Sequence, residues 1–236
     1  MKEKLYTVPV NDAFDAQGEC PLCTLRRDLE RRAVEFVLGP SYMEDDVRTK
    51  TNELGFCREH LTELLGEKNR LGLAMILKTH LDSQIKAAEP FRKTKIKPKN
   101  LLREDPAAVS NWARVQANTC YICARIDAFF PHYLDTILHL YKHEADFRTK
   151  YENAKGFCGE HLADLIDEGR KRLRGEELQA FYDKTMEMYL NGLGRVRDDL
   201  EWFAKKFDYR FRDEPWKESK DSIERAAVKT NGILKE

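Results

Sequence analysis

The chain has 236 residues, 35% of them charged, and its 41 basic side chains are balanced by 41 acidic ones. This balance leaves no global basic field that would attract nucleic acid or anionic lipid. Residues 1–6 lack the apolar run of a signal peptide, and no apolar stretch approaches membrane-spanning length. We therefore expect a soluble cytoplasmic protein that does not span a membrane and carries no strong nucleic-acid signal.

Helical periodicity runs through the first half of the chain. Apolar residues recur at three- and four-residue spacing over 22–36, and the Gly-Pro pair at 39–40 ends that predicted helix. A second helix is predicted over about 41–53. A third begins at the Gly-Phe-Cys turn of 55–57, and residues 73–88 continue a helical phase.

The second half follows the same scheme. Pro131 is expected to break or kink the first helix of this half. The longest predicted helix covers about 176–207, although Gly192 and Gly194 inside it weaken the prediction of a continuous helix. A short amphipathic helix in the tail is predicted to end near 231–232. Since no segment alternates with period two, the predicted fold class is all-α.

The sequence also contains an internal duplication. Cys20, Cys23, Asp46 and Lys50 have counterparts 100 positions later, and from Gly55 onward the offset is 101. Such register over 40 positions indicates one supersecondary unit written twice, that is, two pseudo-symmetric helical repeats. The predicted organisation is a first repeat at 1–90, a basic proline-containing linker at 91–111, a second repeat at 112–207 with the long helix, and a C-terminal tail at 208–236.

All six cysteines and two of the six histidines fall into one four-residue pattern, which occurs once in each copy. Each copy has a CxxC motif followed by a GFCxxH motif, so it supplies three thiolates and one imidazole, the ligand set of a closed tetrahedral zinc site. The spacing allows each CxxC to join the CxxH of its own copy or of the other. The predicted metal ligands are Cys20, Cys23, Cys57, His60, Cys120, Cys123, Cys158 and His161.

The motifs suit metal binding in their local structure. Both CxxC motifs lead directly into helices, whose first N–H groups and macrodipole stabilise anionic sulfur. A cysteine and a histidine at i and i+3 project from one helical face toward one ion. Gly55 and Gly156 allow a sharp turn before the third ligand, and Phe56 and Phe157 are expected to give apolar cover.

Other polar residues near the motifs have less specific roles. The Arg-Thr-Lys triplets at 48–50 and 148–150 are interpreted as hydrogen-bond partners of the metal-bound sulfurs or as surface groups, with an anion site as the alternative. Glu59 and Glu160 are expected to support the first helical turn rather than act as bases. The three histidines within 132–143 lie along one helix face, and we interpret them as ordinary histidines rather than a third metal site.

The repeated CPxC-type and GFCxxH motifs, with the residues at 208–210, 214–216 and 221–222, resemble an uncharacterised prokaryotic family of duplicated CxxC…GFCxxH helical proteins. The resemblance covers most of the chain, and the GFCxEH pair is its most specific part. The second CxxC, at 120–123, departs from the family pattern by lacking proline but keeps both cysteines. The family implies this fold and these sites but no established activity.

Three functions remain open from the sequence. The first is a non-enzymatic protein with two mainly structural zinc ions, a binding or adaptor module for an unknown protein or a small anionic ligand. Four protein ligands leave no open coordination position for catalysis. The second is a thiol redox or metal-sensing protein, against which the lack of a thioredoxin-like βαβ context counts. The third is an iron–sulfur protein with Cys3His ligation, although cysteine-only ligation is the commoner rule.

Overall fold

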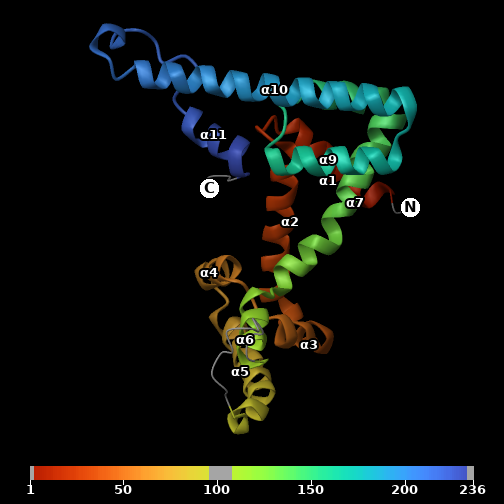
Figure 1. The fold of residues 1–236 in the computed structure, drawn as a ribbon, viewed down its shortest axis with the longest axis vertical. Coiled ribbons are helices and arrows are strands. Elements are labelled where there is room, and N and C mark those ends of the chain that lie inside the picture. Colours follow the sequence, from red (N-terminus) through yellow and green to blue (C-terminus); the bar gives the residue numbers. More distant parts are fainter. Residues whose placement is uncertain (1–2, 96–107, 233–236) are drawn as a thin grey trace, which may run out of the picture. The chain divides into compact units, whose positions relative to one another are not determined.

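The structure is a computed structural model that describes residues 3–95 and 108–232 (Figure 1). Within these residues the chain forms α-helices and short 3-10 helices, and it contains no strand, which confirms the predicted all-α class. Contacts divide the chain into two compact units. Unit 1 consists of Met1–Asp28 and Phe129–Glu236, and unit 2 is Leu29–Ala128.

The helices are distributed over the two units, and α2 and α7 contribute to both. Unit 1 holds α1 (Glu3–Asp15), the start of α2 (Pro21–Leu38), most of α7 (Tyr121–His143), α8 (Ala145–Glu152), α9 (Gly159–Arg172), α10 (Gly175–Lys205), η3 (Tyr209–Phe211) and α11 (Ser222–Asn231). Unit 2 holds the rest of α2, η1 (Pro40–Met43), α3 (Asp45–Leu54), α4 (Arg58–Gly66), α5 (Arg70–Ala88), η2 (Glu89–Lys93), α6 (Ala108–Asn118) and the start of α7.

Each unit therefore combines helices from both sequence copies. The predicted organisation follows the copies along the chain, with boundaries at 1–90, 91–111, 112–207 and 208–236, whereas the unit boundaries fall inside α2 and α7. α6 begins within the predicted linker, and residues 96–107 of that linker lie outside the described residues.

The predicted helices of the first half are present with adjusted limits. α2 matches the prediction over 22–36, and 41–53 corresponds to η1 and α3. The single helix expected from 55–57 onward is instead two helices, α4 and α5. Asn69 starts α5 by accepting a hydrogen bond from the Gly72 N–H at 2.9 Å, so a new N-terminal cap interrupts the helical phase. α1 was not expected, and it contains Pro9.

In the second half, α7 and α10 continue through the proline and the glycines that count against continuous helices in the sequence. α7 continues through Pro131, where the missing N–H removes one backbone hydrogen bond. Burial of the flanking Phe130 and Leu134 offsets that loss. α10 likewise continues through Gly192 and Gly194, so tertiary packing overrides the weak helical preference of glycine.

An aromatic cluster forms the core of unit 1 and holds one of the Gly-Phe-Cys turns. The fully buried Tyr151 has its ring 5.8 Å from that of Phe14, 5.3 Å from that of Phe157 and 5.8 Å from that of Phe181. Its hydroxyl shares a 2.8 Å hydrogen bond with Thr185, which satisfies the one polar atom of the ring. Phe157 thus packs its turn against Tyr151 of α8, whose ring also contacts α1 and α10.

Helices α9, α10 and α11 pack against one another in unit 1 (Figure 1). The approach is closest at Gly192 of α10, where a Cβ atom would lie 2.6 Å from the carbonyl oxygen of Lys155 and 2.9 Å from the Nζ of Lys229. Gly194, two residues later in the same helix, has open space around it. Gly192 therefore serves packing, whereas Gly194 has no such steric role.

We expect opposite effects from alanine at these two glycines. Gly194→Ala should stabilise the protein by about 0.5–1 kcal/mol, because alanine favours the helix and nothing obstructs its methyl group. Gly192→Ala should destabilise it by about 1–3 kcal/mol, since its methyl group meets a backbone oxygen. Urea unfolding followed by circular dichroism measures both. Equal stabilisation by the two substitutions would contradict the packing described for α10.

Candidate metal centres

The structure brings the eight predicted ligands together in two groups of four. Site A consists of Cys20, Cys23, Cys158 and His161, and site B consists of Cys57, His60, Cys120 and Cys123. Within each site, the sulfur and ring-nitrogen atoms all lie within 4.8 Å of one another. The sequence left the pairing of motifs open, and the structure pairs each CxxC with the CxxH of the other copy. Site A lies in unit 1 and site B in unit 2.

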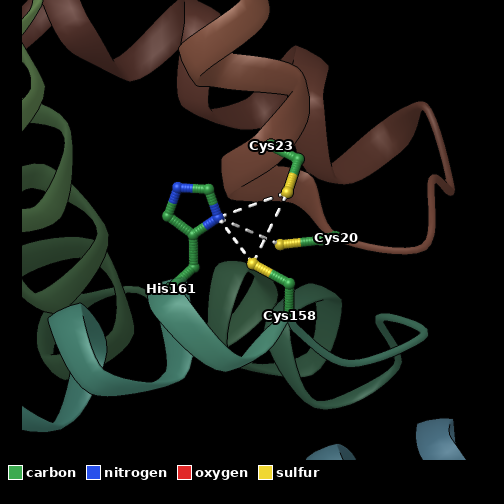
Figure 2. Close-up of side chains that lie close together, drawn as sticks. All are labelled: Cys20, Cys23, Cys158 and His161. Carbon is green, nitrogen blue, oxygen red and sulfur yellow. Dashed lines mark hydrogen bonds between the residues drawn. The ribbon is translucent and has the colours of Figure 1, made fainter. Parts of the chain in front are cut away.

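In site A the four side chains point toward a common centre (Figure 2). The Nδ1 atom of His161 lies 3.5 Å from the sulfur of Cys20, 3.3 Å from that of Cys23 and 3.1 Å from that of Cys158. The sulfurs of Cys23 and Cys158 are 3.6 Å apart. None of the four residues is more than 3% exposed, so the centre is closed to solvent.

Site B has the same arrangement, with the CxxH motif of the first copy and the CxxC motif of the second. The Nδ1 atom of His60 lies 3.2 Å from the Cys57 sulfur and 3.3 Å from the sulfurs of both Cys120 and Cys123. The sulfurs of Cys57 and Cys123 are 4.0 Å apart. Cys120 and His60 are buried, whereas Cys57 and Cys123 are half-buried.

These separations match the edges of a tetrahedron around one ion. Zinc bonds of about 2.3 Å to sulfur and about 2.0–2.1 Å to nitrogen give edges of about 3.8 Å between sulfurs and about 3.6 Å between sulfur and nitrogen. Every distance given above lies within about 0.5 Å of these values. A disulfide requires about 2.05 Å between sulfurs, and all six cysteines are free.

Both sites lie where the N-termini of two helices meet, α2 with α9 in site A and α4 with α7 in site B. Cys57 and Cys158 are the N-cap residues of α4 and α9, and Cys20 and Cys120 directly precede α2 and α7. The second ligand of each motif follows three residues later, in the first helical turn. The positive ends of two helix dipoles therefore face each set of sulfurs and favour the thiolate forms.

The two Gly-Phe-Cys turns need glycine because their backbones are left-handed and closely packed. Gly55 has φ = 58° and Gly156 has φ = 98°. A Cβ atom on Gly55 would lie 2.6 Å from the Nε2 of His80, and one on Gly156 would lie 2.7 Å from the Met188 carbonyl oxygen. A side chain at either position would be strained by the positive φ and would clash with His80 or with the backbone at Met188.

The two sites differ in how their turns are joined. In site B the carbonyl oxygen of Gly55 accepts a 2.9 Å hydrogen bond from the N–H of Tyr121, which lies between Cys120 and Cys123. Pro21 occupies the corresponding position in site A and has no N–H to donate. The departure of 120–123 from the proline-containing pattern thus adds a backbone hydrogen bond between the two halves of site B.

The histidines also differ in their second ring nitrogen. The Nε2 of His60 forms a 2.8 Å hydrogen bond with the carboxylate of Glu30. This carboxylate fixes the ring with Nδ1 toward the sulfurs, as carboxylates commonly do for metal-bound histidines. The Nε2 of His161 is buried and has no hydrogen-bond partner among the described residues. The ring of His161 is oriented by packing instead, 5.4 Å from the ring of Phe130.

Without a cation, the donors of site B share their protons unequally. Burial lowers the pKa of His60, but its hydrogen bonds to the Cys120 sulfur and to Glu30 outweigh burial and raise this pKa to about 10. Burial raises the pKa of Cys120, but the hydrogen bond from His60 prevails and lowers it to about 6. Burial and the charge of Cys120 raise the pKa of Cys123 well above its usual range. At neutral pH, site B therefore holds an imidazolium, a thiolate and a protonated thiol.

Site A shows the same competition between adjacent sulfurs. Hydrogen bonds from Cys20 and Cys23 lower the pKa of Cys158 strongly, whereas the hydrogen bonds to Cys158 and Cys20 raise that of Cys23. Burial lowers the pKa of His161, but the Cys158 and Cys20 sulfurs outweigh it and raise the pKa to about 10. A bound cation would displace these protons and allow all three sulfurs to be thiolates.

Of the other polar residues singled out in the sequence, Glu59 has a pKa that is lowered by a hydrogen bond from its own backbone N–H and by a side-chain hydrogen bond with Cys57. Lys150, Arg148 and Glu160 make contacts away from the sulfurs. Lys150 bonds to Asp15 at 2.7 Å, and the guanidinium of Arg148 lies over the ring of Tyr141. Glu160 pairs with Arg26 at 3.7 Å. The histidines of 132–143 contact aromatic rings, including one another, and form no metal-ligand group among the described residues.

Two residues near the sites were missed by sequence reasoning. Glu30 lies on α2 and carries no motif signal, since one more acidic residue on a charged helix face is unremarkable there. Lys229 of α11 donates hydrogen bonds to the carbonyl oxygens of Glu19 and Lys155. It contacts the site A turns from 210 positions away, so only the tertiary fold reveals it.

Comparison with protein-family models gives a match over residues 1–236 to a family described as "Family of unknown function (DUF6062)", and the chain belongs to this family. No curated protein and no solved structure matches the chain. Among the described helices, none combines the length and apolar character that crossing a membrane requires.

Zinc binding to site B should release protons across the neutral and alkaline range. One proton leaves the Nδ1 of His60 and another leaves Cys123, because zinc takes the neutral imidazole and the thiolate. The loaded state holds fewer protons, so zinc affinity should rise with pH. The rise should continue at least to about pH 10, since the pKa of His60 is about 10 and that of Cys123 lies well above its usual range. Calorimetry in buffers of different ionisation enthalpy measures the proton release. A zinc affinity that does not change with pH above about pH 7 would contradict this release.

Glu30→Gln should weaken metal binding at site B by about 10- to 100-fold, since a neutral amide oxygen accepts the hydrogen bond more weakly and no longer polarises the imidazole with a negative charge. Site A should keep its affinity. Glu35→Gln is the matched control, because Glu35 lies on the same helix and pairs with Arg31 at the surface. Competition with a chelator of known zinc affinity measures the change. Equal affinities for the Glu30 and Glu35 variants would show that the carboxylate does not act through His60.

Proposed function

We propose that the protein binds two zinc ions, one in site A and one in site B, as structural cross-links of a helical binding or adaptor module. The main support is the spacing of the donors, which in both sites corresponds to one tetrahedral ion held by three sulfurs and one Nδ1 atom. Among the common divalent ions, zinc is the one that best suits a tetrahedral set of thiolate and imidazole donors.

The structural role follows from what each ion would join. Site A connects the start of α2 to the start of α9, and site B connects the start of α4 to the start of α7. These segments are far apart in the chain, so closing the loops between them costs entropy that metal binding offsets. With four protein ligands, neither ion keeps an open position for water or substrate. Metal-binding free energy thus becomes folding free energy.

The two alternatives have less support. An iron–sulfur cluster carries its protein ligands on different iron atoms, so its donors lie further apart than donors that share one ion. The donor distances in both sites favour a single ion. A thiol redox or metal-sensing role gains one point of support from the half-buried Cys57 and Cys123. The described residues contain no strand and hence no thioredoxin-like context for these CxxC motifs.

The remaining parts of the proposal concern location and partners. Reduced cysteines in two CxxC motifs suit the cytoplasm, where structural disulfides are rare. Equal numbers of acidic and basic residues do not favour nucleic acid. The partner of the module would be a protein or a small anionic ligand, held by a surface whose shape the two ions keep fixed.

Pairs of cysteine variants test both the metal content and the pairing of motifs. The wild-type chain, purified without oxygen and with zinc supplied, should contain two zinc ions per chain. Cys20→Ser/Cys158→Ser should keep one ion, because both changes fall in site A. Cys20→Ser/Cys57→Ser should lose both, because it damages each site. Elemental analysis measures the content.

The opposite pattern would result if each CxxC joined the CxxH of its own copy, since Cys20 and Cys57 would then share one ion. A visible absorption spectrum of the same samples separates the metals. Zinc thiolate sites are colourless, whereas iron–sulfur clusters are brown. A wild-type zinc content near zero after zinc-replete purification would overturn the proposed function.

A further inference from the structure

Sites A and B have the same donors but different surroundings. All four residues of site A are buried, whereas two residues of site B, Cys57 and Cys123, are only half-buried. The two sites therefore do not differ in their type of donor. They differ in how accessible their cysteines are from solvent.

The end of helix α11 covers site A. Gly232 terminates α11 with a left-handed backbone, φ = 68°. A Cβ atom at this position would lie 3.3 Å from the sulfur of Cys23 and 4.0 Å from that of Cys158. The backbone of the helix end thus lies directly against two of the three sulfurs, one from each half of the site. Glycine is the residue that permits both this turn and this close approach.

Lys229, one turn earlier in α11, fastens the same helix end to the site. Its buried ammonium group donates a hydrogen bond to the carbonyl oxygen of Glu19 at 2.6 Å and another to that of Lys155 at 2.8 Å. Glu19 directly precedes Cys20, and Lys155 directly precedes the turn that leads to Cys158. One side chain from α11 therefore joins the backbones of both halves of site A. Hydrogen bonds from a charged, buried donor are among the stronger ones.

Ion pairs hold α11 to the same point from its outer side. Arg225 of α11 contacts Asp199 of α10 at 2.8 Å and lies 4.0 Å from the carboxylate of Glu19. Glu19 also pairs with Arg195 of α10 and lies 3.4 Å from the Nζ of Lys229. The carboxylate next to Cys20 is thus shared by α10 and α11, and removing α11 from site A separates Lys229 from Glu19 and the partly buried Arg225 from Asp199.

We propose that α11 is a lock on site A, so that site A retains its metal while site B exchanges its metal with ligands in solution. The proposal rests on the proposed function, namely that both sites hold zinc. An incoming ligand must reach the ion or a sulfur before a zinc–sulfur bond breaks. It can approach the half-buried sulfurs of site B in the folded protein, whereas at site A it must wait until α11 opens locally.

Zinc release to an excess of the chromogenic chelator 4-(2-pyridylazo)resorcinol tests this inference on the full chain. The wild type should release its two ions in two phases of equal amplitude, with rates that differ by about tenfold or more, because opening α11 breaks the charged hydrogen bonds of Lys229. Cys57→Ser/Cys123→Ser should lack the fast phase. Cys20→Ser/Cys158→Ser should lack the slow phase.

Variants of α11 then separate the lock from general stability. Lys229→Met should accelerate the slow phase by about tenfold or more and leave the fast phase unchanged. Lys220→Met is the matched control, since Lys220 is an exposed lysine of the same C-terminal segment, and it should alter neither phase. Gly232→Ala is a milder change at the helix end, and it should also accelerate only the slow phase, because its methyl group opposes the turn and meets the Cys23 sulfur.

Amide hydrogen exchange in α11 gives a second measurement that does not depend on whether Lys229→Met folds. In the wild type, α11 should stay protected after the fast ion has left and lose protection only with the slow ion. Two bound ions released at one rate, or a fast phase that belongs to site A, would overturn the lock and leave the zinc proposal intact. Absence of bound zinc would overturn the proposed function as well.

Discussion

Three sulfurs and an imidazole nitrogen meet within 4.8 Å at two places in this chain, and this crowding governs the structure around them. Thiolates so close together repel one another strongly, because little water remains to screen them. Without a cation, adjacent thiols respond in opposite directions: the pKa of Cys158 falls while that of Cys23 rises, and Cys120 and Cys123 divide in the same way. A divalent ion would remove this conflict, so the packing of the donors favours metal binding.

The duplication acts through an exchange of motifs. Neither sequence copy contains a complete site, because the CxxC of each copy meets the CxxH of the other. The compact units follow this exchange, since their boundaries fall inside α2 and α7, after Asp28 and Ala128, five residues past the end of each CxxC motif. The arrangement is similar to a domain-swapped dimer joined into one chain. Exchange of this kind makes folding of one copy depend on the other, which a pair of independent zinc modules would not require.

The sequence predicted the all-helical class and the membership of both sites as a set, because all six cysteines obey one repeated rule. It could not predict the pairing, since the offsets of 100 and 101 residues suit either arrangement. It also could not show why Gly192 lies inside α10, as that glycine makes room for Lys155 and Lys229. The contacts of Glu30 and Lys229 depend on tertiary packing, and no local motif marks either residue.

The two sites have the same set of ligands, but different contacts hold each site closed. Site B has the hydrogen bond from Tyr121 to Gly55 and the carboxylate of Glu30 on its histidine. Site A has neither, and α11 holds its two halves together from outside instead. If both sites hold zinc, the carboxylate of Glu30 strengthens metal binding at site B through His60, whereas α11 acts on the opening of site A. Under the proposed function, the cover by α11 would therefore change how fast a ligand reaches the ion of site A without changing the bonds that the ligand must replace.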